Sequence, residues 1–423
     1  MNLLTLDALL LFALSIPVVM RYRILPITGT PYWLFGILFF ILLCNMLISL
    51  YPIIKKPAHV LRLKLFFLLT TLFIVVGGTT ITAIIDRNNT APVYGVHDII
   101  LQQEAAMRYL LIGKNPYKET YFGTPVEQFH YDELDKPSGK SAINPALYHF
   151  VMPPWYLLFP FLFYFISTPL LGFFDGRMVL LFSLAGLIYI LYRWFVDKKI
   201  AHVVIALTAL SPAFVDYFIE GRSDMFALFW FVWSLYLLDK KKFVASSIIF
   251  ALALLSKQTI WFAVPFYFIY AWLMFKKSLK TTIIKVIMPS VLIVFALVLP
   301  FLLWDARAFV DSIIFYLSGN SASAYPISGY GWGMLLYSLG IIKNIHAYYP
   351  FIIWQTVIGL PIMGVTLWWM TKKLSMSRLL VGYGVTLMVI WYVSRYFNNS
   401  HLGYLSSVFV LGVLKDWDEK GTA

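Results

Sequence analysis

The sequence predicts an all-α polytopic membrane protein. Hydrophobic residues make up 61% of the 423 residues, charged residues make up 13%, and the mean hydropathy is +0.79. A soluble domain of this length could not bury that much apolar surface. Apolar runs near the length that a helix needs to cross a bilayer also recur along the chain. We therefore expect a single membrane domain over residues 1–423, with about 12 transmembrane helices (range roughly 11–14).

The expected spans fall in three groups. Residues 1–85 hold three N-terminal helices, residues 177–304 the central helices, and residues 349–423 the C-terminal helices. The first run has no charged segment before it and no small-residue cleavage pattern after it, so we expect a membrane helix rather than a cleavable signal. By length the spans are 3–20, 32–54, 65–85, 177–196, 200–218, 224–238, 243–256, 259–275, 281–304, 349–370, 378–394 and 401–414.

Charge placement predicts the orientation. Five short connections are rich in basic residues, and the positive-inside rule assigns them to the cytoplasm. These are the connections around Lys55, Lys198, Lys241, Lys276 and Lys373. Eight of the 20 acidic residues lie in residues 86–145, on the opposite side. We therefore expect outer loops at 86–176 and 305–348 in a cell (plasma) membrane. This placement explains the net charge of +13 without a nucleic-acid partner.

The stretch 147–170 is apolar but contains Pro153, Pro154, Pro160 and Pro169. Proline cannot continue helical hydrogen bonding. An outer loop at 86–145 and a cytoplasmic cluster after 196 also leave room for one crossing, which 177–196 supplies. We therefore expect 147–170 to be a broken helix in the outer leaflet, with a tilted spanning helix as the alternative. The stretch 331–347 is ambiguous in the same respect.

The second outer loop has a small, polar centre at residues 318–326, followed by Gly329, Gly331 and Gly333 alternating with Tyr330 and Trp332. This composition favours either a mobile flap that carries aromatic rings or a plain connection.

The first outer loop supplies the leading catalytic candidate. Residues 97–112 predict a short amphipathic juxtamembrane helix that ends at Gly113, with Asp98 in its first turn. Asp98 is either a helix N-terminal acid or a group that acts on a substrate. Glu104 and Tyr117 of this loop are candidates for substrate or donor binding, and an acidic cluster closes the loop at Asp132, Glu133 and Asp135.

Further candidates lie at the expected outer ends of helices. Asp216 and Glu220 share a helix face before Arg222 and Asp224, either as a site or as a solvated hairpin. Lys257 separates two apolar runs, where an ammonium could hold a phosphate or could reach water. Arg395 suits bidentate phosphate contact, and His401 could donate a proton or a hydrogen bond. The substrate- and donor-binding candidates are Glu104, Tyr117, Glu220, Arg222, Asp224, Lys257, Arg395 and His401.

The sequence contains neither a metal-binding motif nor a nucleotide loop. Histidine and cysteine do not cluster at ligand spacing, and the single cysteine, Cys44, lies in an apolar run. We expect no metal ligands and no required cofactor. A divalent ion held by Asp98 with Asp224 and a donor phosphate is left open.

Several segments together resemble a known family. Asp98 is followed by Gly113-Lys-Asn-Pro-Tyr117, then by Pro153-Pro154 and by Ser211-Pro212 through Gly221-Arg-Ser-Asp224. Lys257 and the stretch from Arg395 to His401 complete the order. The chain resembles the integral-membrane glycosyltransferases of the GT-C superfamily, most of all the mannosyltransferase-like branch that uses polyprenyl-phosphate sugars.

The resemblance implies a hexosyltransferase of EC class 2.4 with a GT-C-like fold. It would transfer mannose or a similar sugar from a polyprenyl-phosphate donor to a lipid-linked or cell-envelope glycan acceptor, by inverting general-base catalysis. The resemblance makes Asp98 the base, Lys257 and Arg395 the phosphate ligands, and Asp224 and Glu220 the groups that orient sugar hydroxyls. Membrane lipid would surround the site on the extracytoplasmic side.

Two other classes remain as alternatives. A transporter or flippase of lipid-linked sugars would favour an inverted repeat and ionisable residues at the bilayer midplane, and the sequence shows neither. An O-antigen polymerase or ligase would favour basic outer loops, whereas residues 86–145 carry eight acidic and six basic residues.

Overall fold

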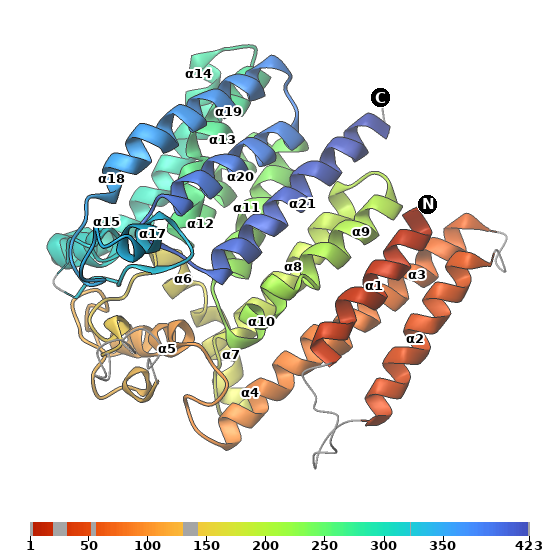
Figure 1. Ribbon diagram of the computed structural model, residues 1–423, viewed down its shortest axis with the longest axis horizontal. Coiled ribbons are helices and arrows are strands. Elements are labelled where there is room, and N and C mark those ends of the chain that lie inside the picture. Colours follow the sequence, from red (N-terminus) through yellow and green to blue (C-terminus); the bar gives the residue numbers. More distant parts are fainter. Residues whose placement is uncertain (1–2, 20–31, 52–55, 130–142, 322, 422–423) are drawn as a thin grey trace.

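The computed structural model describes residues 3–19, 32–51, 56–129, 143–321 and 323–421 (Figure 1). It is 77% helical, and its two strands, β1 (Ser328–Gly329) and β2 (Tyr396–Phe397), pair in parallel. The fold agrees with the predicted all-α class. The acidic cluster Asp132, Glu133 and Asp135 lies outside the described residues.

Six helices of the described chain are long and apolar enough to cross a membrane, and a bent pair forms a seventh candidate. Length and composition thus support a membrane-embedded protein. Several other predicted spans are apolar helices of 10–17 residues, which is shorter than the roughly 20 residues that a helix needs to cross the hydrocarbon core. The six are Tyr32–Leu50, Pro57–Asn89, Pro154–Leu171, Arg177–Trp194, Leu279–Ser318 and Phe351–Lys372.

The N-terminal group begins with α1 (Leu3–Val19) and α2 (Tyr32–Leu50), close to their predicted bounds. The third helix is longer than the predicted 65–85. It joins α3 (Pro57–Leu72), the π-helical segment η1 (Phe73–Gly78) and α4 (Thr79–Asn89) into 33 residues. Pro57 fits its start because the first helical turn needs no N–H from that position.

The predicted helix 97–112 is α5 (Asp98–Leu111), with His97 as its N-cap and Gly113 after it at φ +74°. The three polar side chains in the middle of α5, Gln102, Gln103 and Glu104, are not directed into water, because residues 100–107 are all buried. The Gln102 amide donates to two backbone carbonyls at 2.6 Å, and the Gln103 amide donates to a third at 2.7 Å. The polar face of α5 therefore holds the neighbouring loops in place. Two short 3-10 turns follow, η2 (Pro125–Gln128) and η3 (Pro145–Leu147).

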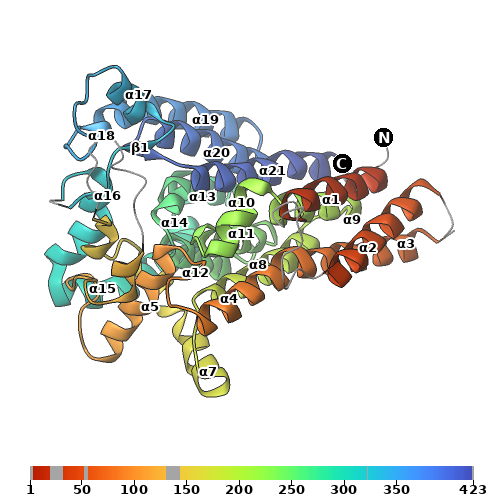
Figure 2. The same ribbon diagram turned by 60° about the horizontal axis from the view of Figure 1, so that its bottom comes forward.

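The proline-rich stretch forms α6 (Pro154–Leu158) and α7 (Phe161–Leu171), with the expected break at residues 159–160. Together they are long and apolar enough to cross a membrane, as the alternative interpretation requires. Figure 2 shows α7 projecting from the helix bundle, across the direction of α4 and α8. Whether this stretch crosses the bilayer stays a prediction.

The central helices surround the buried helix α11 (Asp224–Asp239). The predicted span 200–218 is broken into two helices, α9 (Lys198–Ala209) and α10 (Pro212–Glu220). The axes of these two helices are bent by 56° relative to each other. Nearly all of α11 is buried, and α11 packs against both α8 and α12. The elements are α8 (Arg177–Trp194), α9 (Lys198–Ala209), α10 (Pro212–Glu220), α11 (Asp224–Asp239), α12 (Phe243–Leu254), the 3-10 segment η4 (Gln258–Ala263) and α13 (Val264–Met274).

The next helix extends into the expected second outer loop. Helical residues run from Leu279 to Ser318, so the loop predicted at 305–348 begins only after α16. Asp305 lies at a kink with φ −162° and ψ 93°, and its carboxylate accepts the Ala308 N–H at 3.0 Å, which caps the outer part. The elements are α14 (Leu279–Thr282), η5 (Ile283–Ile287), α15 (Met288–Val310), η6 (Asp311–Phe315) and α16 (Tyr316–Ser318).

The remaining loop and the C-terminal helices complete the bundle. The ambiguous stretch 331–347 holds only α17 (Trp332–Ser338) and turns, which is too short to cross a bilayer. The C-terminal elements are α18 (Phe351–Trp354), η7 (Gln355–Gly359), α19 (Leu360–Lys372), α20 (Met376–Tyr392) and α21 (Asn399–Gly421).

The bundle has two chemically different ends. The end with the start of α5, the α10–α11 turn and the segment between α20 and α21 is called the polar end here. The end with the lysine-bearing turns after α8, α11, α13 and α19 is called the lysine end. In Figure 1, α5 and α17 lie at the lower left, and α14 and the C-terminus lie at the top and right. Successive helices run from one end to the other.

Candidate functional site

A cavity of about 780 Å³ opens at the polar end and is called the main cavity here. Five segments that are far apart in sequence line it. They are the start of α5 (95–102), the α10–α11 turn (217–224), the α12–η4 junction (257–258), α16 and the loop after it (316–330) and the segment from β2 into α21 (396–401). Phe129 and a sixth segment, 144–152, complete the lining.

Asp98 lies on the wall formed by α5. One carboxylate oxygen is 2.6 Å from His97 Nδ1, and the other accepts the Asn144 amide at 3.1 Å. The Ile99 N–H also points at His97 Nδ1, but at a longer 3.3 Å. Burial raises the pKa of Asp98, but the charge of His97 and the hydrogen bonds from His97 and Asn144 outweigh it. The pKa of Asp98 therefore lies below its usual value, and the carboxylate is ionised at neutral pH.

The start of α5 is fastened directly to the α10–α11 turn. The His97 N–H donates to the Glu220 carbonyl at 2.8 Å. Gly221 follows with φ +103°, and a side chain there would come within 2.4 Å of Ile100. Only glycine permits both this backbone conformation and this close packing. The predicted acid of the first loop and the predicted acidic hairpin thus share one cavity.

Asp224 and Lys257 form a buried ion pair in the main cavity. Lys257 Nζ lies 2.6 Å from Asp224 Oδ1, and the Asp224 side chain is 8% exposed. The other oxygen, Asp224 Oδ2, is buried and has no hydrogen-bond partner in the described part of the chain. A buried carboxylate oxygen in this state is ready to accept a hydrogen bond from a ligand. Lys257, in contrast, is already neutralised by Asp224.

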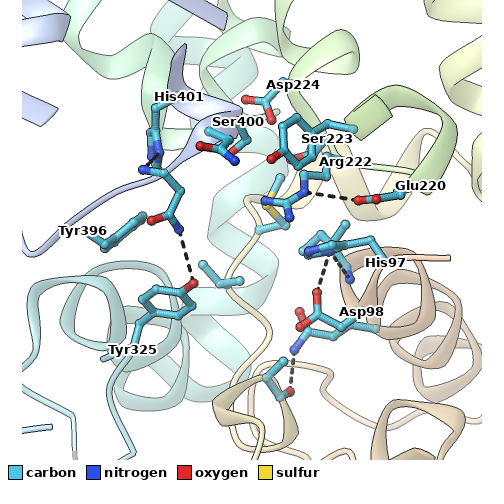
Figure 3. A pocket seen from close by; sticks show the side chains of 18 of the residues that line it. His97, Asp98, Glu220, Arg222, Ser223, Asp224, Tyr325, Tyr396, Ser400 and His401 are labelled. Carbon is cyan, nitrogen blue, oxygen red and sulfur yellow. Dashed lines mark hydrogen bonds and ion pairs between the residues drawn. The ribbon is translucent and has the colours of Figure 1, made fainter. Parts of the chain in front are cut away.

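Arg222 carries the least engaged cation of the described lining. Its Nε is 3.9 Å from the exposed Glu220 carboxylate, beyond hydrogen-bond distance, and its guanidinium lies 4.2 Å from the Tyr217 ring centre. Among the described residues, we find no hydrogen bond to its two terminal nitrogens. Figure 3 shows Arg222 between Asp224 and the His97–Asp98 pair. Its planar fork can therefore hold an anion at two points.

The opposite wall is rich in tyrosine. Tyr325 and Tyr396 have ring centres 4.8 Å apart, and the Tyr325 hydroxyl accepts the Asn398 amide at 3.4 Å. His401 also lines this wall, and its Nδ1 accepts the Asn398 N–H at 2.9 Å. Figure 3 shows these groups across the cavity from Asp98 and Arg222. The cavity therefore has one charged wall and one aromatic, amide-bearing wall.

The structure places Glu104 outside the main cavity. Both its oxygens bind Arg87, at 2.8 and 2.7 Å, and the Gly176 N–H donates to it at 3.1 Å. Arg87 also pairs with Asp175 at 2.8 Å, and Asp175 pairs with Arg177 at 2.8 Å. Glu104 thus belongs to an ion network that joins α4, α5 and the start of α8.

Tyr117 is likewise a packing residue. It is 2% exposed, its hydroxyl donates to the Met152 carbonyl at 3.0 Å, and its ring packs edge-on against Phe150, Phe301 and Phe309. Among the described residues it does not line the main cavity. Its hydroxyl and its ring are thus both engaged by neighbouring protein groups.

Arg395, predicted as a phosphate ligand, is 2% exposed and lies behind the cavity wall. Its Nε donates to the Tyr325 carbonyl, and its terminal nitrogens donate to the carbonyls of Ala347, Ile345 and His346 at 2.9, 3.2 and 3.4 Å. These contacts, together with the pairing of β1 with β2, fasten residues 325–347 to the segment before α21. The stretch predicted as a flap or a connection is therefore held at residues 325–329 and again at residues 345–347.

Sequence reasoning missed Asn144 and the tyrosine wall, because nothing in their local sequence separates them from other loop residues. It also missed a buried cluster toward the lysine end. Asp7 contacts Lys64 at 2.5 Å and His202 at 3.4 Å, and Lys64 donates to Asn45 at 2.9 Å. An acid within the apolar run 3–20 was the available signal for it.

The part of the chain that the structure describes holds no group of three or more His, Cys, Asp or Glu residues able to bind a metal ion. Comparison with protein-family models, curated proteins and solved structures gives no match for this chain. The fold and the main cavity define an all-α membrane protein with one charged, tyrosine-walled site at the end of its helices.

Proposed function

We propose that this protein is a membrane glycosyltransferase that moves a hexose, such as mannose, from a polyprenyl-phosphate donor to a lipid-linked or cell-envelope glycan. The observation that carries the proposal is the pairing, in one cavity, of an ionised carboxylate with a guanidinium free to hold an anion. The volume of about 780 Å³ lies within the usual range for small-molecule sites.

Asp98 is the base of the proposed reaction. Its carboxylate takes the proton of the acceptor hydroxyl as that oxygen attacks the anomeric carbon. The bond from the anomeric carbon to the lipid phosphate breaks, and its electron pair leaves with the phosphate. Attack from the side opposite to the leaving group inverts the anomeric configuration. His97 and Asn144 orient the carboxylate through their contacts at 2.6 and 3.1 Å.

Arg222, rather than Arg395, holds the departing phosphate in this proposal. Its terminal nitrogens are open to the cavity, whereas those of Arg395 are bound to backbone carbonyls. A guanidinium that contacts the phosphate as charge develops on it lowers the barrier. Lys257 supports this charge from its ion pair with Asp224.

The sugar hydroxyls face Asp224 and the tyrosine wall. Asp224 Oδ2 accepts one hydroxyl, and the exposed Glu220 carboxylate is available to a second. The apolar faces of Tyr325 and Tyr396 suit the C–H face of a pyranose ring. Asn398 and His401 add hydrogen-bonding groups beside these rings.

The proposed topology has twelve crossings and resembles a GT-C fold, with the polar end outside the cell. The support is the alternation of connections between the two ends of the bundle, with lysine-bearing turns on one side. Helices such as α11 are short, but they are buried by protein and do not need a full lipid-facing length. The crossings are α1, α2, α3–α4, α8, α9–α10, α11, α12, η4–α13, α14–α15, α18–α19, α20 and α21.

The decisive experiment measures transfer from a panel of labelled polyprenyl-phosphate sugars by the purified protein. Asp98→Asn should lower the transfer rate by about 100- to 10,000-fold, and Arg222→Gln by about 100-fold or more. Asp86→Asn is the matched control, since Asp86 is an exposed acid at the end of α4. Transfer that survives Asp98→Asn at the rate of this control would remove Asp98 as the base.

The same assay separates the other function classes. The buried Asp7–Lys64–His202 cluster lies in helices of the bundle, a feature that would suit a transporter of lipid-linked sugars. A transporter moves the labelled lipid without making a glycosidic bond, so a new glycosidic product excludes transport as the sole activity. A chelator arm tests the divalent ion: with Asp98 engaged by His97 and Asn144, we expect the transfer rate to be unchanged.

A further inference from the structure

A second cavity of about 360 Å³ lies apart from the main cavity, between the end of α4, the middle of α5, α7 and the turn before α8. This second cavity is lined by polar groups that include Arg87, Arg108, Asn88 and Thr168. It lies where the long helix Pro57–Asn89 ends. A molecule in it would therefore sit at the boundary between the apolar and polar parts of the bundle.

The charges in this second cavity leave one cation over. Arg87 and Arg177 are balanced by Glu104 and Asp175 through contacts of 2.7 to 2.8 Å. Arg108 is exposed, and in the described part of the chain we find no ion pair or hydrogen bond to its guanidinium. The lining itself holds two arginines, Arg87 and Arg108, and two acids, Glu104 and Asp175. Arg177, which pairs with Asp175 from behind the lining, gives this group of five residues a net charge of +1, and the guanidinium of Arg108 is the point at which it would attract an anionic group.

An unpaired hydroxyl points to a ligand independently of this charge. Thr168 Oγ1 is buried and has no hydrogen-bond partner among the residues that the structure describes. Buried hydroxyls in proteins are normally paired, with protein groups or with a bound molecule. Thr168 lines the second cavity from α7, whereas Arg108 lines it from α5. One phosphate group with several oxygen acceptors can engage both.

The outer surface of α7 is apolar next to this second cavity. Leu162, Phe165, Ile166 and Leu170 are 59–77% exposed, at the spacing of one helical face. Figure 2 shows α7 projecting beyond the rest of the bundle. Such a face suits contact with hydrocarbon chains. A ligand with an anionic head and apolar chains matches both surfaces.

We infer that the second cavity binds the headgroup of an anionic phospholipid, with its phosphate on Arg108 and Thr168 and its acyl chains along α7. This lipid is distinct from the proposed sugar donor and does not depend on the glycosyltransferase proposal. Because one arginine contributes on the order of 1 kcal/mol toward an anionic lipid, the preference for anionic over zwitterionic lipid should be several-fold.

The test is native mass spectrometry of the purified full chain with phosphatidylglycerol or phosphatidylcholine of equal chain length. Phosphatidylglycerol should bind the unaltered protein several-fold more tightly. Arg108→Gln should abolish that preference. Lys114→Gln, which removes another exposed cation just after α5, should retain it. Thr168→Val should weaken phosphatidylglycerol binding without lowering the melting temperature, since Oγ1 has no protein partner to lose.

Two outcomes would overturn the inference. The first is an equal preference for phosphatidylglycerol in the Arg108→Gln and unaltered proteins, or an equal loss in the Lys114→Gln control. The second is binding of glycerol 3-phosphate as tight as that of phosphatidylglycerol, which would make the site one for a soluble phosphate. A variant that loses lipid preference but retains sugar transfer would contradict neither proposal alone, because the two activities are measured separately. Failure of sugar transfer with lipid preference retained would count against the proposed function and not against this inference.

Discussion

Arg222 and Arg395 have the same side chain but different surroundings, and those surroundings set their roles. Arg395 is 2% exposed and donates to four backbone carbonyls between residues 325 and 347. Its guanidinium is therefore already hydrogen-bonded to protein and is not open to a ligand. Among the described residues, the Arg222 guanidinium lies against a tyrosine ring and, at 3.9 Å, a carboxylate, and we find no hydrogen bond from its terminal nitrogens. Of the two, Arg222 alone can change partners when an anion enters the main cavity.

His149 is a second residue whose surroundings determine its chemistry. Its Nε2 lies 2.9 Å from Ser321 Oγ, and its Nδ1 lies 3.4 Å from Ser312 Oγ and 3.6 Å from Asp311. Burial lowers the pKa of His149 from 6.5, and the charge of Asp311 opposes this only in part. His149 is therefore neutral at pH 7 and ties the loop after α16 to the segment before α6.

Protonation of His149 should loosen this tie. Because its folded pKa is depressed, its contribution to stability is complete above the unfolded value of about 6.5 and is lost as the pH falls through the lower folded value. We expect the melting temperature to fall as the pH drops below 6.5, and His149→Gln to flatten that fall. Thermal unfolding between pH 7.5 and pH 5 measures both.

His59→Gln serves as the control for this titration, since His59 is exposed at the start of α3. If His59→Gln flattened the pH dependence as much as His149→Gln, general titration of surface groups would explain the effect. The role assigned to His149 would then be wrong.

At the scale of elements, the segment between α20 and α21 holds the tyrosine wall in place. Ser328 and Gly329 pair with Tyr396 and Phe397, and Arg395 clamps the same loop through backbone carbonyls. A Cβ on Gly329 would lie far inside van der Waals contact distance of the Phe397 carbonyl oxygen and so clash with it. The wall depends on this close approach of two backbones.

Arg395→Met should therefore act through stability. Loss of the guanidinium leaves buried carbonyls unpaired, at a cost of about 3 kcal/mol or more in the free energy of unfolding. Arg395→Lys should restore little, because one ammonium cannot reach the same set of carbonyls. The measurements are the melting temperature and, for protein folded at low temperature, the KM for the lipid donor.

These two readouts distinguish a clamp from the phosphate ligand that the sequence predicted. A clamp gives a lower melting temperature with both variants. A phosphate ligand would instead give a raised KM at an unchanged melting temperature, with partial rescue by Arg395→Lys. The second pattern would contradict the role that the structure gives to Arg395.

At the scale of the whole molecule, the two ends of the helix bundle differ in their charged residues. The main cavity gathers six segments at the polar end, and the lysine-bearing turns lie at the other. A broad apolar core of helices from all parts of the chain lies between them. This arrangement lets a charged cavity persist beside lipid, because protein helices surround it.

The proposed orientation can be tested with single cysteines, since Cys44 is the one cysteine of the chain. In a Cys44→Ser background, Lys114→Cys lies at the polar end and Lys240→Cys at the lysine end, and both positions are exposed. A membrane-impermeant maleimide added to intact cells should label Lys114→Cys and spare Lys240→Cys.

Both positions should react after the cells are permeabilised, which is the control for accessibility. Labelling of Lys240→Cys in intact cells, with protection of Lys114→Cys, would invert the proposed topology. The main cavity would then face the cytoplasm, and a donor presented on the outside could not reach it.

The sequence was sufficient for the features that depend on local composition. Apolar runs predicted an all-α membrane protein, and the pattern after His97 predicted α5 with Asp98 in its first turn. The predicted helix bounds were too short where a helix continues beyond its apolar run into polar sequence. The long helix reaching Ser318 and the early start at Pro57 are such cases, since helical hydrogen bonding does not require apolar residues.

Only the tertiary structure decided which polar residues share the main cavity. Asp98, Glu220, Arg222, Asp224, Lys257 and His401 meet there, whereas Glu104, Tyr117 and Arg395 have their polar groups bound elsewhere. The reason is physical: the role of an ionisable side chain depends on whether its hydrogen bonds are already made, and in this chain the partners lie up to 222 residues away in sequence. Composition and spacing determined the class of this protein, and long-range pairing determined its site.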